Sequence, residues 1–287
     1  MQMIKAGEPV EPSQAANAAQ AKRWNGASGQ YWVAHRERHL AEHRHLTPHL
    51  FRAAGISPGE RVIDVGCGCG DMTIAAARAA AGHGAGSGWA VGLDLSAPML
   101  EVAGQLAAQA GVANVGFVRG DAQAGPLRGD SFDVVISKFG VMFFDNPHAA
   151  FASLAVRLRP GGRLAFLCWQ DDELNEVFAI PLRAATDCTK PPAPGASKLF
   201  TDPDQIAALL SGSGWADVQV IPVVEPAWVG SDVDDVIKYI RGVAEILGDD
   251  RDLERMLAHI ADDYAARQRP DGVWVRAAAW LVTAHRA

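Results

Sequence analysis

Short apolar runs and amphipathic stretches alternate along the middle of this chain. The apolar runs are rich in β-branched residues and have the length of buried strands. They lie at 61–65, 89–94, 114–119, 132–138 and 163–169. Helical spacing of apolar residues is found between them, at 71–81, at 97–110 and from Asn146 to Leu158. Strands that alternate with helices predict βαβ units and therefore a parallel sheet in an α/β fold.

The two ends of the chain depart from this alternation. Residues 1–20 have the composition of a tail or a frayed helix, 28–45 have a helical pattern, and Thr47-Pro48 begins another helix that ends at Gly55. After residue 169 we expect helices at 173–186, 203–213, 232–247 and 251–267, strands at 216–224 and 273–284, and a Pro-rich loop at 190–195.

These extra segments predict how the chain is organised. We expect an N-terminal tail and helical lid over residues 1–55, followed by a core over 56–287. The core carries cover insertions near 170–200 and 230–268, and substrate specificity is expected to reside in these cover segments.

A glycine-rich turn follows the first predicted strand, in the sequence Val62-Ile-Asp-Val-Gly-Cys-Gly-Cys-Gly-Asp71. Glycines at such a turn let the backbone bend sharply and approach a ligand. A dinucleotide site would have its third glycine at the position of Asp71, where pyrophosphate meets the helix N-terminus. Asp64 adds a second acid, and no Lys or Arg lies between Arg61 and Arg78. The turn therefore favours a cationic or zwitterionic ligand over a phosphate.

Two later strands also end in acids. Asp94 ends the run Trp89-Ala-Val-Gly-Leu, where a carboxylate can bind a ribose diol. Asp121 follows Val115-Gly-Phe-Val-Arg-Gly and can accept a hydrogen bond from an exocyclic adenine amine.

With these pieces in view, the chain resembles the class I S-adenosylmethionine-dependent methyltransferases. The matching segments come in family order: 62–70, Gly92-Leu-Asp-Leu-Ser-Ala-Pro-Met99, Gly120-Asp-Ala122, Phe132-Asp-Val-Val-Ile-Ser137 and Leu158-Arg-Pro-Gly-Gly-Arg-Leu164. The resemblance implies a doubly wound, Rossmann-like, seven-stranded sheet that is mostly parallel with an antiparallel last strand. Within the family, quinone-biosynthesis-type and natural-product enzymes are the most similar.

The resemblance also implies which residues bind S-adenosylmethionine. Asp64, Gly66, Gly68 and Gly70 would surround its methionine part, and Asp94 its ribose. Leu95 and Met99 would pack on the adenine ring, whose edge would meet Gly120, Asp121 and Ala122. Ser137 ends the fourth strand, at the edge where such sheets place ligands.

Histidines are concentrated near the N-terminus. His35, His39 and His43 recur every four residues, with His45 and His49 just beyond. A solvated helix face, a metal site and a general base are three interpretations of this pattern. As candidate bases we name His35, His39 and His45; the family's chemistry requires no metal. Trp24, Tyr31 and Trp32 would help to close a pocket.

Composition restricts the partners that we expect. The 287 residues carry a net charge of −7, which disfavours a nucleic-acid partner. No apolar run has the length of a membrane span, and the N-terminus lacks a signal core. Four cysteines without disulfide or metal spacing favour a reducing compartment, so we expect a cytoplasmic protein. The sequence does not fix the oligomeric state, and a homo-oligomer is one alternative.

These observations predict methyl transfer to a small, largely apolar acceptor. The fourth strand lacks the Asn/Asp-Pro-Pro sequence with which some methyltransferases grip an amine, so O- or C-methylation is favoured and a quinone-like or secondary-metabolite acceptor is expected. Two alternatives are a non-catalytic module that binds the cofactor and a nicotinamide-dependent oxidoreductase, which Asp71 disfavours.

Overall fold

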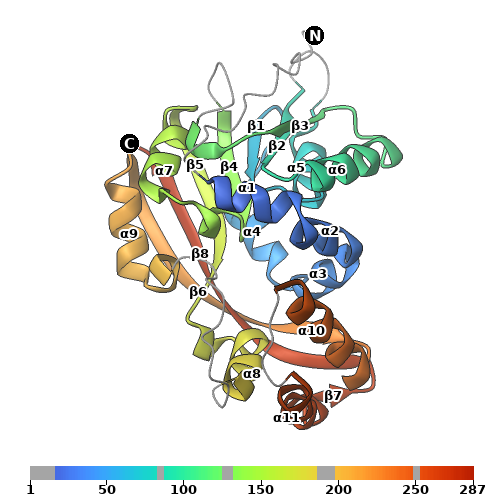
Figure 1. Cartoon of the computed structure of the whole chain (residues 1–287). Helices are drawn as coiled ribbons and strands as arrows, with labels where there is room; N and C mark the ends of the chain where they lie inside the picture. The colour runs from blue at the N-terminus through green and yellow to red at the C-terminus, as the bar shows by residue number, and fades with distance from the viewer. Residues whose placement is uncertain (1–16, 83–86, 125–131, 186–197, 248–252) are drawn as a thin grey trace.

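The computed structural model describes residues 17–82, 87–124, 132–185, 198–247 and 253–287. At its centre is one sheet with the strand order β3-β2-β1-β4-β5-β8-β6 (Figure 1). The parallel strands are β1 (Arg61–Val65), β2 (Trp89–Asp94), β3 (Val115–Arg119), β4 (Phe132–Lys138) and β5 (Leu158–Trp169). β8 (Gly272–Arg286) runs antiparallel to β5 and to β6 (Trp215–Gly230). The predicted α/β sheet with an antiparallel last strand is confirmed, and a two-residue strand, β7 (Gln268–Arg269), adds to it beside β8.

The helices that join the parallel strands form where the sequence predicts them. They are α5 (Asp71–Ala80), α6 (Ala97–Gln109) and α7 (Pro147–Ala155), and α9 (Pro203–Ser211) precedes β6. Ser96 caps α6 and Asn146 caps α7, each by accepting a backbone amide hydrogen bond. A proline fills the first turn of both helices, where no amide donor is needed. Short polar caps followed by proline are therefore reliable local signals in this chain.

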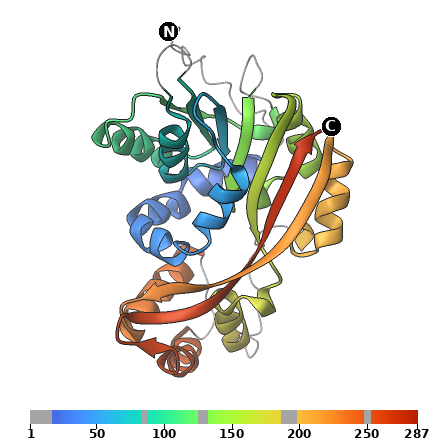
Figure 2. The same ribbon diagram turned by 180° about the vertical axis from the view of Figure 1, so that it is seen from behind.

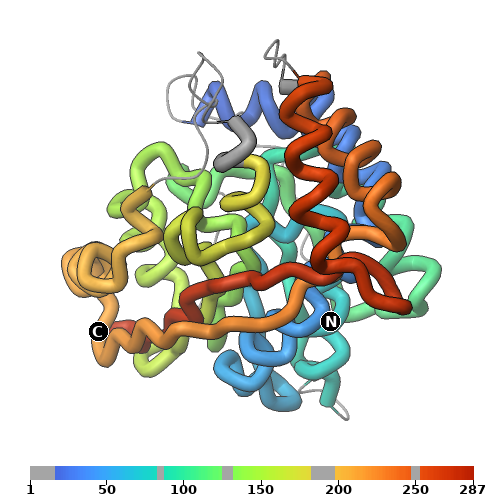
Figure 3. Tube along the Cα trace, turned by 90° about the horizontal axis from the view of Figure 1, so that it is seen from below, coloured from blue at the N-terminus to red at the C-terminus, as the bar shows by residue number. Residues whose placement is uncertain are grey.

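β6 is much longer than its predicted strand at 216–224, whereas β8 extends the predicted strand at 273–284 only slightly. Seen from behind (Figure 2), they form a curved ribbon that extends beyond the parallel sheet, and Figure 3 shows them running side by side. β8 is buried along most of its length, and small residues at Ala277–Ala279 leave room for covering elements. Around this extension lie α8 (Glu176–Ala185), α10 (Val233–Leu247) and α11 (Leu253–Ala265). None of the helices in the described ranges is long and apolar enough to cross a membrane.

The N-terminal region differs from the single helix predicted for residues 28–45. It forms three short helices, α1 (Ala18–Asn25), α2 (Ala27–Ala34) and α3 (Arg36–Glu42), before α4 (Thr47–Ala54). The chain leaves helical geometry at Gly26, which is extended, and again at His35. Glycine accounts for the break at residue 26, whereas the break at His35 has no strong sequence signal and goes with packing of α2 and α3 against α10 and β6. Of the predicted features, the tail through residue 16 and the loop at 190–195 lie outside the described residues.

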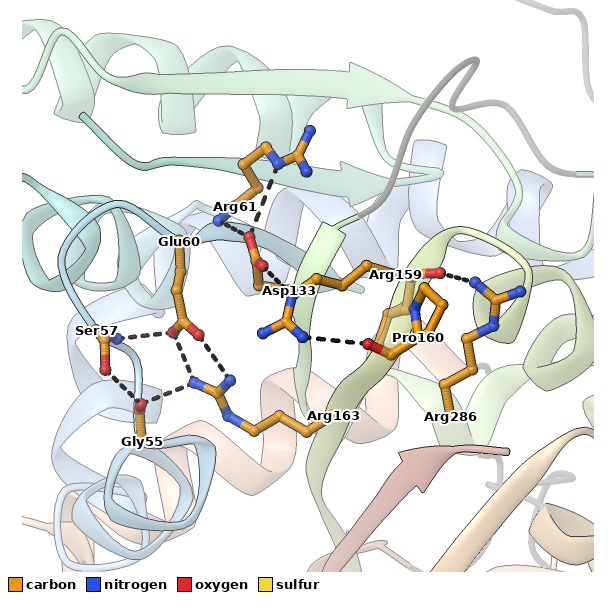
Figure 4. A network of polar contacts seen from close by, with 10 residues as sticks. Gly55, Ser57, Glu60, Arg61, Asp133, Arg159, Pro160, Arg163 and Arg286 are labelled. Carbon is orange, nitrogen blue, oxygen red and sulfur yellow. Dashed lines mark hydrogen bonds and ion pairs between the residues drawn. The ribbon is translucent and has the colours of Figure 1, made fainter. Parts of the chain in front are cut away.

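Ion pairs connect residues at the amino ends of the parallel strands, at the edge of the sheet opposite their carboxyl ends (Figure 4). Arg163 of β5 donates to both carboxylate oxygens of Glu60, at 2.8 and 2.6 Å, and to the Ala54 and Gly55 carbonyls that end α4. Asp133 of β4 accepts from Arg159 and from the Arg61 amide. The hydrogen bond from Arg163 holds the pKa of Glu60 below its usual value. Burial opposes the ionisation of Asp133, but its arginine partners outweigh burial and lower the pKa of Asp133 as well.

Arg163→Met should lower the free energy of unfolding at neutral pH by about 1–3 kcal/mol, the range for hydrogen bonds to charged groups. Because the folded pKa of Glu60 is depressed, its contribution is present above the unfolded pKa and is lost as the pH falls through the folded one. Urea denaturation from neutral to acid pH should therefore show the difference between variant and wild type shrinking below about pH 4, down to the part that Arg163 contributes through the Ala54 and Gly55 carbonyls. Arg241→Met, which breaks the exposed pair with Glu254, is the control and should leave stability unchanged. A difference between variant and wild type that keeps its full neutral-pH size in acid would contradict the assignment to Glu60.

Candidate functional site

A cavity opens where the strand order of the sheet reverses. β1 has β2 on one side and β4 on the other, and ligands of doubly wound folds bind outside the carboxyl ends of the strands at such a point. The cavity, together with the open solvent at its mouth, occupies about 760 Å³. Its lining comes from the ends of β1 to β4, from α1 and α2, and from residues 138–144.

The glycine turn after β1 forms one wall of the cavity. Gly66, Gly68 and Gly70 all have positive φ, at 68°, 53° and 81°. The amides of Gly66 and Cys67 donate to the Leu93 carbonyl, and the Gly68 amide donates to Asp94. A Cβ atom on Gly66 would lie only 2.7 Å from the Gly140 Cα, so the turn after β1 meets the turn after β4 backbone to backbone. Glycine is required at Gly66 for both its conformation and its close contact.

Two acids line the cavity at the ends of β2 and β3. Asp94 accepts hydrogen bonds from the Gly68 and Ser96 amides, both at 2.8 Å, and burial raises its pKa. Asp121 accepts from the Asn17 side-chain amide at 3.1 Å and from the Gln123 amide at 2.9 Å. Both carboxylates are thus held in place by the protein and still border the cavity.

Eight of the predicted cofactor-binding residues line the cavity: Gly66, Gly68, Asp94, Leu95, Met99, Gly120, Asp121 and Ala122. The other three lie behind its wall. The Thr73 hydroxyl donates to buried Asp64 at 2.6 Å, and the Ser137 hydroxyl donates to the Val65 carbonyl at 2.7 Å. Gly70 makes room for Ala103 and Phe117. In this arrangement Asp64, Gly70 and Ser137 shape the turn, and burial raises the pKa of Asp64 to about 7.

Two basic side chains from distant parts of the chain lie near the acidic turn, although the sequence around the turn contains no Lys or Arg. Arg36 of α3 forms a two-point ion pair with Asp71 at the start of α5. Lys138, the last residue of β4, borders the cavity itself. The absence of Lys and Arg near the turn in sequence therefore does not describe its charge in three dimensions.

The N-terminal helices contribute part of the lining of the cavity. Trp24 of α1 and Trp32 of α2 line it, as does Asn17, which also accepts a hydrogen bond from the Asp145 amide. Asn25 bonds to the Leu95 carbonyl and the Ala97 amide, so α1 is attached to the turn after β2. Asn17 has no signal in the sequence, because a single Asn at the end of a predicted tail does not stand out.

None of the three candidate catalytic histidines lines the cavity. His35 stacks on Tyr31 with ring centroids 3.9 Å apart, His39 stacks on Trp32 at 3.7 Å, and His45 lies beside Trp274 at 5.8 Å. The interpretation of this histidine stripe as a solvated helix face is wrong, because His39 is buried, with only 7% of its surface exposed. A role for these histidines in proton removal remains a prediction.

A partly buried acid lies beside two histidines of this stripe. Glu42 is within ion-pair distance of His39 at 3.6 Å and of His43 at 3.5 Å. Burial opposes its ionisation, but the two imidazoles outweigh burial and hold the pKa of Glu42 below its usual range. Among the described residues, no group of three or more His, Cys, Asp or Glu side chains is arranged to hold a metal ion.

Residues 62–162 match the family described as "Methyltransferase domain". An uncharacterized protein of Mycobacterium tuberculosis is 38% identical over 151 residues, which are 52% of each chain. The demethylmenaquinone methyltransferase of Mycolicibacterium paratuberculosis is 29% identical over 213 residues, 69% of this chain and 86% of that enzyme. Residues 62–162 are therefore a methyltransferase domain. This methyltransferase domain includes the glycine turn and the ends of β1 to β4.

Other comparisons agree with this methyltransferase domain. Aklanonic acid methyltransferase DauC from a Streptomyces species is 34% identical over 108 residues, 38% of this chain and 47% of that enzyme. The crystal structure of the YcgJ protein of Bacillus subtilis shares the fold, with a TM-score of 0.59 and 22% identity over 85% of this chain and 99% of that chain. The match to the Mycobacterium tuberculosis protein spans about half the length of that relative.

Proposed function

We propose that this protein transfers a methyl group from S-adenosylmethionine to an oxygen or carbon atom of a small, largely apolar acceptor. The cavity at the ends of β1 to β4 carries this proposal, because backbone amides, two acids and several aromatic rings meet there. Demethylmenaquinone methyltransferase and aklanonic acid methyltransferase are relatives named for small-molecule acceptors, and they support the same class of substrate.

The lining of the cavity fits S-adenosylmethionine by its chemistry. Gly66 and Gly68 have no side chains that would fill the space beside the turn, which suits the zwitterionic methionine part. Asp94 can accept hydrogen bonds from ribose hydroxyls, and Asp121 from an adenine amine. Met99 is buried and offers an apolar contact for a ring. When bound, S-adenosylmethionine supplies an electrophilic methyl group on a sulfonium that is a good leaving group.

The remaining task of the protein is alignment and the exclusion of water. We propose that residues 1–55 form a lid for this purpose and that residues 56–287 form the core, with cover segments near 170–200 and 230–268. Trp24, Trp32, Phe143 and Phe144 support the proposal, since their rings border the cavity from two sides. Trp24 packs edge-on against Phe143 with ring centroids 5.3 Å apart, so lid and core share one aromatic wall.

Asp94→Ala should weaken binding of S-adenosylhomocysteine by about 1–3 kcal/mol, the scale of charge-assisted hydrogen bonds. The reason is that the proposed ribose contacts and the brace on the Gly68 amide are lost together. Isothermal titration calorimetry measures this change. Asp94→Asn is the matched control, because it keeps one acceptor oxygen and should lose less affinity. Equal affinity in all three proteins would refute the ribose assignment.

The proposal as a whole is tested with the wild-type chain. S-adenosylhomocysteine should bind, and a radiolabelled methyl group should pass from S-adenosylmethionine to one of a panel of hydroxylated aromatic compounds. Tight binding of a nicotinamide dinucleotide without binding of S-adenosylhomocysteine would overturn it. Binding of S-adenosylhomocysteine without transfer to any acceptor would favour the non-catalytic module.

A further inference from the structure

Lys138 is the only lysine or arginine among the described residues that line the cavity. It ends β4, and the next residue, Phe139, stacks on Trp169 with ring centroids 3.9 Å apart. Among the described residues, no carboxylate lies within ion-pair distance of the Lys138 ammonium group and none of their side chains forms a hydrogen bond with it. The cavity is therefore bordered by a cation that has no direct partner there.

The acids near Lys138 already have other partners. Asp71 is paired with Arg36, Glu42 lies between His39 and His43, and Asp64 accepts the Thr73 hydroxyl. Burial lowers the pKa of Lys138, even though Asp71, Asp64 and Glu42 oppose this change. Each carboxylate is satisfied elsewhere, so the unpaired ammonium group can gain most from an anion that enters the cavity.

The rings around Lys138 indicate the shape of that anion. Phe139 follows Lys138 directly in the chain, and Phe143 and Phe144 lie on the same segment; all three line the cavity, as does Trp32 of α2. Flat aromatic walls around one cation suit a planar, conjugated molecule with a negative oxygen.

We propose that Lys138 binds the ionised oxygen of the methyl acceptor, and that the acceptor is therefore a planar enol or phenol. This inference rests on the proposed function and adds to it the ionisation state of the substrate and the residue that recognises it. If the acceptor arrives neutral and Lys138 is deprotonated, the acceptor O–H bond breaks as an N–H bond forms on Nζ. An acceptor that arrives ionised and meets protonated Lys138 forms the same pair of ammonium and oxyanion. This pair fixes the acceptor in the cavity.

The experiment measures acceptor binding to the full chain saturated with S-adenosylhomocysteine. Lawsone, a hydroxynaphthoquinone that is anionic at neutral pH, is compared by calorimetry with its neutral methyl ether. Wild type should bind lawsone at least tenfold more tightly than the ether, and Lys138→Met should reduce this preference to within about twofold. Lys238→Met removes an exposed lysine of α10 and should keep the full preference.

Other outcomes overturn the proposal. A wild type without preference, a preference that survives in Lys138→Met, or failure of both naphthoquinones to bind would each refute it. The carboxylate of the cofactor is the other possible anion: if it is the partner, Lys138→Met weakens S-adenosylhomocysteine at least tenfold but leaves methylthioadenosine unchanged, and the proposal is overturned. Failure of wild type to bind S-adenosylhomocysteine would instead reject the proposed function.

Folding of the variant is checked separately. Because methionine removes a half-buried charge without a partner, Lys138→Met should melt at the wild-type temperature or above it. A clearly lower melting temperature would show that Lys138 supports the fold, and this too would count against a role in binding.

Discussion

Gly66→Ala should lower the free energy of unfolding by about 2–5 kcal/mol and abolish binding of S-adenosylhomocysteine. The left-handed conformation at Gly66 costs about 1–2 kcal/mol for any residue with a Cβ. The new Cβ would also lie 2.7 Å from the Gly140 Cα, and backbone cannot move aside as a side chain can. Forcing the turns apart adds about 1–3 kcal/mol and displaces two walls of the cavity. Urea denaturation and calorimetry measure the two effects.

Gly68→Ala is the matched control for this prediction. Gly68 also has positive φ, but a Cβ there would meet only the Met99 sulfur, at an ordinary distance of 3.7 Å. It should therefore lose only the conformational cost of about 1–2 kcal/mol and retain measurable binding. If both variants lose the same stability, the close approach of the two turns is not what requires glycine at position 66.

The features that the sequence predicts well share a local physical cause. The glycine turn, the acids at Asp94 and Asp121 and the helix start at Asn146 each depend on residues within a few positions of one another. Backbone sterics and strand-end geometry then determine the outcome with little help from the rest of the fold. The predicted parallel order and most of the predicted cofactor side of the cavity follow from these signals.

The features that the sequence does not predict depend on contacts between distant segments. The break at His35 goes with stacking of Tyr31 on that ring and with a hydrogen bond from the Tyr31 hydroxyl to the Tyr239 carbonyl of α10. Helical periodicity alone favours one continuous helix, and the tertiary contacts override it. Arg36 and Lys138 also approach the glycine turn only through tertiary contacts. Both residues are far from the turn in sequence, so local patterns do not predict their approach.

The long ribbon of β6 and β8 shows a similar limit. Trp228 pairs in register with Trp274 and Gly230 with Val273, far beyond the parallel part of the sheet. Pro222 and Pro226 in β6 argue for an earlier end to the strand. Both prolines are tolerated because β6 lies at the edge of the sheet, where only one side of the strand needs its amides.

Gly29→Ala should weaken binding of S-adenosylhomocysteine about 10- to 150-fold while leaving the core folded. Gly29 lies in α2, and a Cβ there would come within 1.9 Å of the Trp24 carbonyl oxygen. This oxygen accepts the Ser96 hydroxyl at 2.7 Å, so α1 cannot shift without breaking its attachment to the turn after β2. Withdrawal of Trp24 from the cavity removes one large aromatic contact, worth about 1.5–3 kcal/mol. Calorimetry measures the affinity, and hydrogen exchange across residues 18–34 should increase.

Gly104→Ala is the control for this lid variant. Gly104 lies in α6, where an added Cβ would meet nothing within 4 Å, so alanine should bind as wild type and stabilise the helix by about 0.5–1 kcal/mol. Melting temperatures separate a lid effect from general unfolding, since Gly29→Ala should melt close to wild type. Normal affinity together with normal exchange in Gly29→Ala would mean that α1 and α2 are not held over the cavity as one unit. Weak binding with normal exchange would instead place the effect in the wall of the cavity, because the helices themselves would then have remained closed.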